Sequence, residues 1–434
     1  MRKILMFLAA ALSSSALQAA GLDSAALHAP LALVEVAGKT LSLTMGPGSG
    51  LAHAAGSPWS DFYSVSDRGP NIPCKDSGKV LGRELCPATD VIFPLPAYTP
   101  SIYPLQVDGD RVSMRGQAIP LHAANGTPFT GLPPQLPNGE RPLGADLQPL
   151  PYSANGIDTE CIAALARGGF WVGEEYGPSL LRVTADGVVR ERLVPKGSES
   201  YYTGSAVPVR AVLPPLLARR ALNRGFEGMA LAPEQTRLFV ALQSPLANPS
   251  AEVAKASRND RLIVLGLDAE GNFARMERGY LLRFPDIKDF APGHRHKALK
   301  LSAMSAVDAQ RVLILLQAGP KVAVYLANLQ GATNLLGGTW AKPETQPSLE
   351  ALVDPAQSGV QPVQLQLLWR GPEEGFPKNL GKIEGMSLVD GKHLLLISDN
   401  DFGIDGAQTT VWQEPLSAAA QRMLKRSERT SPGV

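Results

Sequence analysis

Short apolar runs separated by turn residues dominate the hydrophobic pattern of this chain. Four segments share one layout, an apolar run, a turn and a second apolar run between polar or acidic ends: 49–69, 156–177, 225–246 and 382–403. The last segment reads KIEGMSLVDGKHLLLISDNDFG, with Glu384 before its first run and Asp399 directly after its second. A weaker copy starts at Leu301 and lacks the leading acid. A repeated pair of strands of this kind is typical of a β-propeller.

The geometry of a hairpin turns this layout into a prediction about a site. In an antiparallel hairpin, the start of the first strand lies beside the end of the second strand. If the copies are propeller blades, these ends all lie at one mouth of the central channel. We therefore expect acids from distant parts of the chain to converge there, namely Asp158, Glu160, Glu174, Glu227, Glu384 and Asp399.

The same pattern sets the expected domain organisation. Dense punctuation by 42 Gly and 37 Pro favours turns over long helices, so we expect an all-β fold, a β-propeller of about six blades over residues 21–415. The Pro- and Gly-rich segment at about 69–150 is expected to be an insertion near the N-terminal blade. Residues 416–434 are expected to form a polar C-terminal tail.

The N-terminus and the cysteines indicate the compartment. Residues 1–20 combine a basic start, a short apolar stretch and small residues, which is the layout of a signal peptide, so we expect a periplasmic or secreted protein. Cys74 and Cys86 flank a turn-rich loop, and whether they form a disulfide stays open from the sequence. Cys161 is expected to be a small buried hydrophobic residue.

Charge narrows the choice of partners. The formal net charge is +1 and no basic run is present, which argues against nucleic acid or a membrane surface as the partner. We expect a monomer that binds a small molecule. Motifs of serine hydrolases, P-loop proteins and zinc proteases are absent, and the pair His294 and His296 is expected at the surface.

Several strings in the chain resemble a known family. They are SDRGPN at 66–71, FWVGEEYGPSLLRVTADG at 170–187, NRGFEGMAL at 223–231, LQSPL at 242–246, KIEGMSLVDG at 382–391 and SDNDFG at 398–403. Together, and in this order, they resemble the phytase-like domain of the "esterase-like activity of phytase" family, from about Gly48 to Trp412. The resemblance implies a secreted or periplasmic β-propeller with phosphoester or ester hydrolase activity.

The acids suggest a metal. Several carboxylates at one mouth would repel one another unless a cation lay among them, and hard oxygen ligands suit Ca²⁺ first and Mg²⁺ second. The expected ligands are Asp67, Asp158, Glu174, Asp399 and Asp401. The general base would be Glu160, Glu227 or Glu384, which the sequence does not rank.

Three basic residues lie next to these acids in sequence: Arg68, Arg224 and Lys382. They could hold the phosphate of a substrate, or they could form ion pairs with the acids. Two functions therefore stay open. The first is a metal-dependent hydrolase of phosphate esters, and the second is a non-catalytic β-propeller that binds a ligand or protein, with metal serving only structure.

Overall fold

The computed structural model describes residues 20–372 and 382–425, and the fold is mostly β, as expected. Helices are few and short: α1 (Ser77–Leu81), α2 (Ala251–Ala256), α3 (Ile287–Phe290) and α4 (Ala418–Lys425). Among the described residues no helix has the length and apolar character needed to cross a membrane. The expected signal peptide lies outside the described residues except for Ala20.

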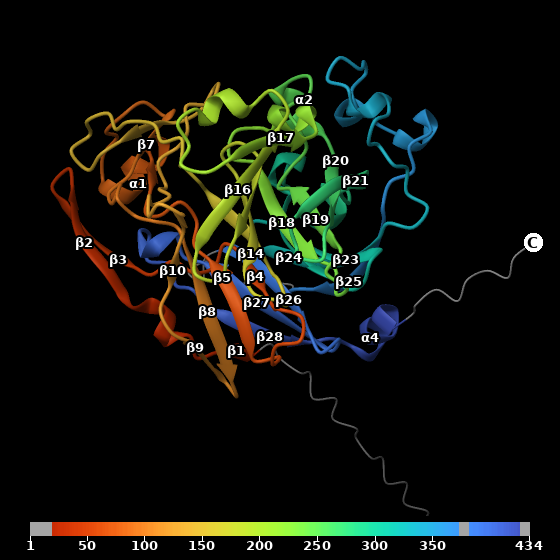
Figure 1. The fold of residues 1–434 in the computed structure, drawn as a ribbon, viewed down its shortest axis with the longest axis horizontal. Coiled ribbons are helices and arrows are strands. Elements are labelled where there is room, and N and C mark those ends of the chain that lie inside the picture. Colours follow the sequence, from red (N-terminus) through yellow and green to blue (C-terminus); the bar gives the residue numbers. More distant parts are fainter. Residues whose placement is uncertain (1–19, 373–381, 426–434) are drawn as a thin grey trace, which may run out of the picture.

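Five sheets each begin with an innermost strand, and these five strands contact one another in a closed order. The sheets make up most of the molecule in Figure 1. The order is β4 (Leu51–Ala52), β13 (Thr159–Ala164), β18 (Phe226–Leu231), β22 (Lys300–Ala306), β26 (Lys382–Val389) and back to β4. The innermost strands belong to separate sheets, so the ring rests on side-chain packing and not on hydrogen bonds between sheets.

From each innermost strand, further strands extend outward, mostly antiparallel. The sheet of β4 adds β5 (Asp61–Val65), β8 (Ser101–Asp108), β9 (Arg111–Met114) and β10 (Ile119–Pro120). That of β13 adds β14 (Phe170–Glu174), β15 (Ser179–Val183), β16 (Val188–Pro195), β11 (His122–Ala123) and β17 (Val209–Leu213). That of β18 adds β19 (Arg237–Leu242), β20 (Asn259–Leu267) and β21 (Phe273–Arg283).

The last two sheets complete the ring. The sheet of β22 adds β23 (Arg311–Ala318), β24 (Lys321–Asn328) and β25 (Gln364–Arg370). That of β26 adds β27 (His393–Asp399), β28 (Val411–Pro415) and β1 (Ala20–Leu22). Since β1 pairs with β28, the two ends of the described chain are tied into one sheet. Helix α4 then packs against β25, with Ala420 and Leu424 buried.

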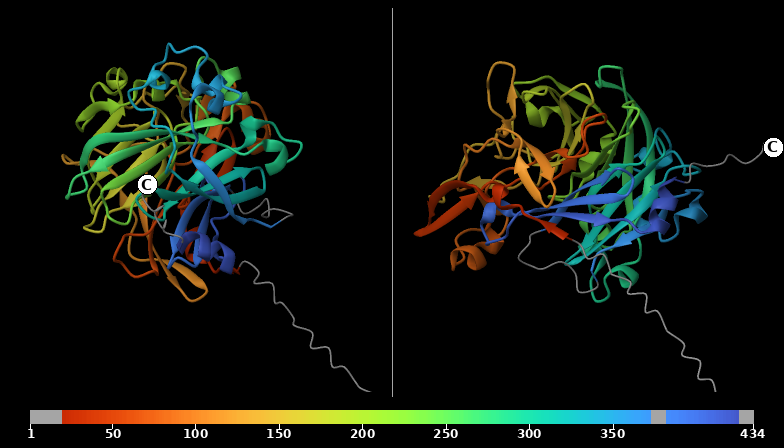
Figure 2. Two further views of the ribbon diagram at one scale, coloured as in Figure 1. Left: turned by 90° about the vertical axis from the view of Figure 1, so that its right-hand side faces the viewer. Right: turned by 90° about the horizontal axis from the view of Figure 1, so that it is seen from below.

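A smaller substructure stands beside the ring. It contains the hairpin of β2 (Pro30–Val36) and β3 (Lys39–Thr44), which projects to one side in Figure 2, and a sheet of β6 (Ile72–Pro73), β7 (Asp90–Ile92) and β12 (Arg141–Leu143). A disulfide joins Cys74 to Cys86, which answers the question left open by the sequence. Within the expected insertion at 69–150, residues 101–120 supply strands β8 to β10 of the first ring sheet instead.

Four of the five innermost strands share a β-bulge near their first residues. The extra, unpaired residues are Glu160, Glu227, Ser302 and Glu384 in β13, β18, β22 and β26, respectively. A bulge leaves one residue outside the ladder and redirects its side chain. The repeated glutamates of the sequence therefore occupy one structural position, and Ser302 occupies it in the copy that lacks an acid.

A small residue follows each bulge because the innermost strands approach closely there. A Cβ atom on Gly385 would lie 2.9 Å from the Cβ of Leu51, in the neighbouring innermost strand. One on Gly228 would lie 2.5 Å from Leu301 of the next strand. Cys161 holds the same position in β13 and is buried, in agreement with its expected role as a small hydrophobic residue.

Replacing this glycine tests the packing of the ring. We expect Gly385→Ala to destabilise the protein by about 1–3 kcal/mol, because the added methyl group overpacks the contact with β4. The matched control is Gly279→Ala in β21, where the nearest atom to the new Cβ would be 3.7 Å away. Urea unfolding of both variants provides the measurement, and equal stabilities would contradict the close packing.

Asp260 is a fully buried acid outside the ring's innermost strands. It is the second residue of β20, its exposed fraction is 0%, and neither carboxylate oxygen accepts a hydrogen bond from a described residue. Burial is the main cause that raises the pKa of Asp260 well above its ordinary value, and the nearby charge of Glu350 raises it further. The folded protein therefore favours the protonated form.

Asp260→Asn tests this with a defined pH dependence. The raised pKa contributes stability below the pKa of unfolded aspartate, near 4, and that contribution is lost as pH rises toward the folded-state pKa. Asparagine does not ionise, so the variant should melt at higher temperature than the wild type at pH 8 and within about 1 °C of it at pH 4. Thermal melts at both pH values measure the difference. If the wild type instead became more stable than the variant as pH rose, the pKa of Asp260 would not be raised in the folded protein.

Candidate functional site

The innermost strands open at one end into a polar cavity of about 530 Å³. Its walls come from the starts of β13, β18, β22 and β26, from the turns that follow second strands, and from the side substructure. Eleven acidic and six basic side chains of the described residues line it. The excess of acid makes this cavity unlike an ordinary protein surface, where opposite charges are interspersed.

Nine of the residues expected at the site line this cavity: Asp67, Arg68, Asp158, Glu160, Arg224, Glu227, Lys382, Glu384 and Asp401. Asp399 does not line it but has a carboxylate oxygen within 4.8 Å of oxygens of Asp67 and Asp401. Acids from the first and last parts of the chain therefore lie close together at this cavity.

Glu174 is the exception to the expected convergence. Its carboxylate accepts hydrogen bonds from the backbone N–H groups of Tyr176 (2.8 Å) and Gly177 (3.2 Å) and from the Ser179 hydroxyl (2.8 Å). These contacts hold the turn between β14 and β15, and Glu174 is fully buried away from the cavity. Its neighbour Glu175 lines the cavity instead, because successive side chains point in opposite directions as the strand ends.

One acidic triad consists of Asp158, Glu160 and Glu175, whose oxygens lie within 4.8 Å of one another. Burial, with the neighbouring charge of Glu140, raises the pKa of Asp158 to about 6. Burial also raises the pKa of Glu175 to about 7, with a further increase from Asp158. The pKa of Glu160 lies well above its ordinary value because of burial and the charges of Glu227 and Asp158. Without a counter-ion, this triad tends to hold protons.

A second acidic triad consists of Asp67, Asp399 and Asp401. Burial raises the pKa of Asp67 and of Asp399, and neighbouring acids add to both shifts. The Lys382 ammonium lies 3.4 Å from an oxygen of Asp401 and 3.9 Å from one of Asp399, and it lowers the pKa of Asp401. Lys382 therefore partly compensates this triad, and in the first triad the guanidinium of Arg68 lies 3.3 Å from an oxygen of Asp158.

Three buried oxygens in the cavity wall have no hydrogen-bond partner among the described residues: Oδ1 of Asn223, Oε2 of Glu227 and Oε1 of Gln243. Glu227 is 1% exposed and Gln243 is 4% exposed. Gln243 directs its amide Nε2 to Glu175 at 3.1 Å, so its carbonyl oxygen remains available. Buried acceptors without donors are costly, and a bound cation would satisfy them. The donor set of carboxylate and amide oxygens thus fits a hard divalent cation.

Four of the six basic residues of the cavity, all but the exposed Lys75 and Lys79, fall into two groups. Arg68 pairs with Glu140 at 2.7 Å and with Asp158 at 3.3 Å, and Lys382 pairs with Glu384 at 3.4 Å as well as with the second triad. Arg224 and Lys300, in contrast, form no ion pair within 4.0 Å in the part of the chain that the structure describes. These two cations are free to contact an anion in the cavity.

The lining residues that were not expected at the site include four polar ones near the triads: Glu140, Glu175, Asn223 and Lys300. The sequence could have indicated Lys300, because it stands two residues before the bulge residue Ser302, just as Lys382 stands two residues before Glu384. Glu175 was visible beside Glu174, but only the turn after β14 decides which of the two faces the cavity. Glu140 comes from the side substructure and accepts a 2.6 Å hydrogen bond from Asn223, a contact with no local signal.

The chain belongs to the phytase-like family described as "esterase-like activity of phytase", which matches residues 44–402. A relative from Arthroderma benhamiae, described as an uncharacterized secreted protein, is 24% identical over 145 residues. That match covers 31% of this chain and only 28% of the relative's length.

Solved structures similar to this chain include propeller-like proteins. The PQQ-bound aldose sugar dehydrogenase of Streptomyces coelicolor is 12% identical with a TM-score of 0.34, covering 92% of this chain and 97% of that one. The WD40 repeats of RRP9 are 10% identical with a TM-score of 0.32, covering 92% and 100%, respectively. The RS223 β-xylosidase is 9% identical with a TM-score of 0.40, covering 86% and 92%.

The two groups of basic residues lead to a prediction about anions. Lys300→Gln removes an unpaired cation from the cavity and should weaken binding of inorganic phosphate by about ten-fold or more. The control Lys392→Gln alters an exposed lysine outside the cavity and should leave phosphate affinity unchanged. Isothermal titration with phosphate measures both, and an equal affinity in Lys300→Gln would assign Lys300 no part in anion binding.

Proposed function

We propose that this protein is a metal-dependent hydrolase of phosphate esters whose reaction takes place in the central cavity. One observation carries the proposal: both acidic triads contribute side chains to the cavity, and two partly buried cations that form no ion pair among the described residues, Arg224 and Lys300, line it too. An acidic cluster alone would favour a structural ion. A cluster beside free cations favours a bound anion that a metal and basic side chains hold together, as phosphate groups are held in many enzymes.

The proposal includes a five-bladed propeller in place of the expected six or so blades. Five innermost strands contact one another in a closed order, and each begins an antiparallel sheet that extends outward. Strand β1 completes the sheet formed by the end of the chain, which is how propellers are commonly closed. In this arrangement the cavity lies at one mouth of the central channel, where equivalent ends of all blades meet.

The residues that would hold Ca²⁺, or Mg²⁺ as the second choice, are those of the two triads, together with the free carbonyl oxygen of Gln243. When bound, the cation would neutralise the phosphate group and lower the pKa of a coordinated water. Glu174, expected as a ligand from the sequence, has no place in this set because its oxygens are used by the turn after β14.

Glu227 is the strongest of the three expected general bases. Glu384 is paired with Lys382, and Glu160 belongs to the first triad, whereas Oε2 of Glu227 has no partner among the described residues. Burial and the charges of Glu175 and Glu384 raise the pKa of Glu227, which makes its carboxylate a better proton acceptor. Arg224 and Lys300 would orient the phosphate oxygens, and Arg68 would fix Asp158 and Glu140 in place.

The alternative is a non-catalytic propeller that binds a ligand or protein through this cavity, with metal serving only structure. The ion pairs of Arg68 and Lys382 favour it, since two of the three expected phosphate-binding residues are engaged with acids. The two functions differ in one respect that can be measured. Only the hydrolase requires a base whose removal abolishes turnover without abolishing metal binding.

The remaining expectations belong to the same proposal. We infer a monomer that is exported to the periplasm or the medium and that acts on a small phosphate ester, not on nucleic acid or a membrane. The Cys74–Cys86 disulfide supports an oxidising compartment, and the fungal relative is described as secreted.

Glu227→Gln tests the proposed base. The substitution keeps the shape of the side chain, so hydrolysis of phosphate monoesters should fall by about 100-fold or more while calcium still raises the melting temperature. The matched variant Glu384→Gln occupies the same bulge position and should retain turnover at saturating calcium, because Glu384 is paired with Lys382 and is not the proposed base. Assays with calcium and with chelator, alongside melts, give both results. Unchanged turnover in Glu227→Gln would refute its role, and no turnover of any ester by the wild type would favour the alternative.

A further inference from the structure

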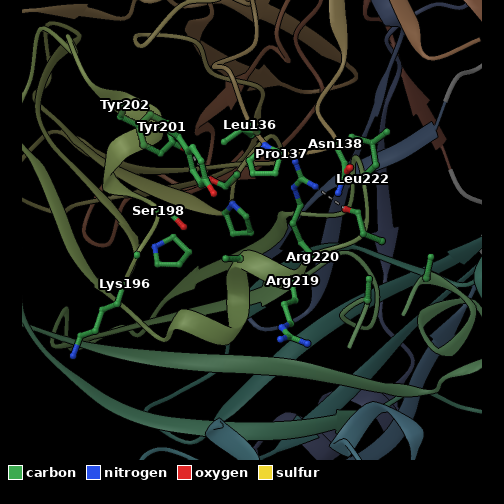
Figure 3. Close-up of a pocket in the computed structure, with 18 of the residues that line it drawn as sticks. Leu136, Pro137, Asn138, Lys196, Ser198, Tyr201, Tyr202, Arg219, Arg220 and Leu222 are labelled. Carbon is green, nitrogen blue, oxygen red and sulfur yellow. Dashed lines mark hydrogen bonds between the residues drawn. The ribbon is translucent and has the colours of Figure 1, made fainter. Parts of the chain in front are cut away.

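A second cavity, of about 630 Å³ and drawn in Figure 3, shares the lining residue Leu222 with the central one. We call it the side pocket. Its walls are largely apolar and rigid, with four prolines among the lining residues: Pro137, Pro178, Pro195 and Pro249. Its volume falls within the range of small-molecule sites, which are concave, mostly apolar and largely preformed.

The two cavities share a wall. Three chain segments contribute to both. In the first, residues 136–138 line the side pocket and Glu140 lines the central cavity; in the second, Gly177 and Pro178 line the side pocket and Glu175 lines the central cavity. In the third, residues 218–222 line the side pocket and are followed by Asn223 and Arg224, which line the central cavity. Leu222 lines both cavities and is 49% exposed, although it is a large apolar residue. A molecule anchored by Arg224 thus has an apolar surface immediately beside it.

The charges of the side pocket differ from those of the central cavity. No acid is among its lining residues in the described chain, whereas Lys196, Arg219 and Arg220 are. Figure 3 draws Lys196 at one end of the side pocket and Leu222 at the other. Arg220 donates through Nε to the Tyr176 carbonyl, and burial lowers its pKa although the charges of Glu174 and Glu175 act in the opposite direction. The pocket is therefore suited to a neutral or anionic apolar group, and unsuited to a cation.

An aromatic surface is already in place in the side pocket. Tyr202 is buried, donates its hydroxyl to the Gly177 carbonyl at 3.1 Å and packs under the Arg192 guanidinium, 4.5 Å from the ring centre. The partly exposed Tyr201 lies beside it in the wall, and its side chain makes no hydrogen bond with any described residue. A tyrosine ring in the wall that no hydrogen bond holds favours stacking on a planar ligand.

We propose that the side pocket receives the aryl group of the phosphate ester whose phosphate occupies the central cavity. This inference rests on the proposed function and names the substrate class: aryl phosphate monoesters. Contacts with a group remote from the reacting phosphorus can be used to orient the ester and raise its rate of hydrolysis. Inositol hexakisphosphate presents charged groups on every side and has no apolar surface for this pocket, so it should be a poor substrate.

The test compares 1-naphthyl phosphate with methyl phosphate, which has no aryl group. In Tyr201→Ala and Ala218→Trp, which remove and fill part of the side pocket, kcat/KM for 1-naphthyl phosphate should fall about ten-fold or more and that for methyl phosphate should stay within about two-fold. The control Tyr152→Ala changes an exposed tyrosine that lines neither cavity and should leave both values unchanged. Thermal melts establish that each variant is folded. Equal losses for both esters, or no loss for either, would overturn the inference.

A binding measurement separates this inference from the proposed function. Calorimetric titration of the calcium-loaded protein should show 1-naphthyl phosphate binding at least about ten-fold tighter than inorganic phosphate, and Ala218→Trp should remove the difference. If the wild type hydrolyses no ester but shows this difference in affinity, the proposed function is wrong and the side pocket is still a binding site for the aryl group. If the two ligands bind equally well to the wild type, the side pocket has no role in recognition, whatever the activity.

Discussion

The close approach of five innermost strands is the constraint on which the rest of the structure depends. Where β26 meets β4, a glycine is required at Gly385 because even a Cβ atom would collide with Leu51. The residue before that glycine is displaced from the ladder by a β-bulge, and in three strands it is a glutamate. The same local irregularity thus permits tight packing of the ring and places Glu160, Glu227 and Glu384 in the cavity.

Crowding these carboxylates has an electrostatic cost that the protein offsets only in part. Burial and mutual repulsion raise the pKa of Glu160, Glu175 and Glu227, so the unliganded cavity favours protons over charge. Arg68 and Lys382 compensate some of the neighbouring acids through ion pairs. What remains is an excess of oxygen acceptors, and such strained polar arrangements are typical of functional sites more than of structural ones.

The division of the chain between ring and side substructure explains how one cavity can acquire specificity. The innermost strands supply the bulge residues, which bring charged groups into the cavity but little apolar surface. Loops outside the ring supply apolar shape, since Leu222 and the 136–138 segment stand where the two cavities meet. Loops can change without disturbing the packing around Gly385, so under the proposed function substrate preference would vary on a constant set of acids.

The sequence by itself determined the β class, the family and the convergence of acids at hairpin ends, because strand alternation and tight turns are local rules that residues such as Glu227 and Glu384 obey. Other features were decided only in three dimensions. Glu175 lines the cavity in place of Glu174, because the turn after β14 holds the Glu174 carboxylate in three hydrogen bonds. Glu140 reached the cavity from a separate substructure, and Arg68 was drawn into ion pairs with it and with Asp158. Contacts between segments far apart in the chain depend on how sheets and loops pack together, and no local pattern of residues encodes that packing.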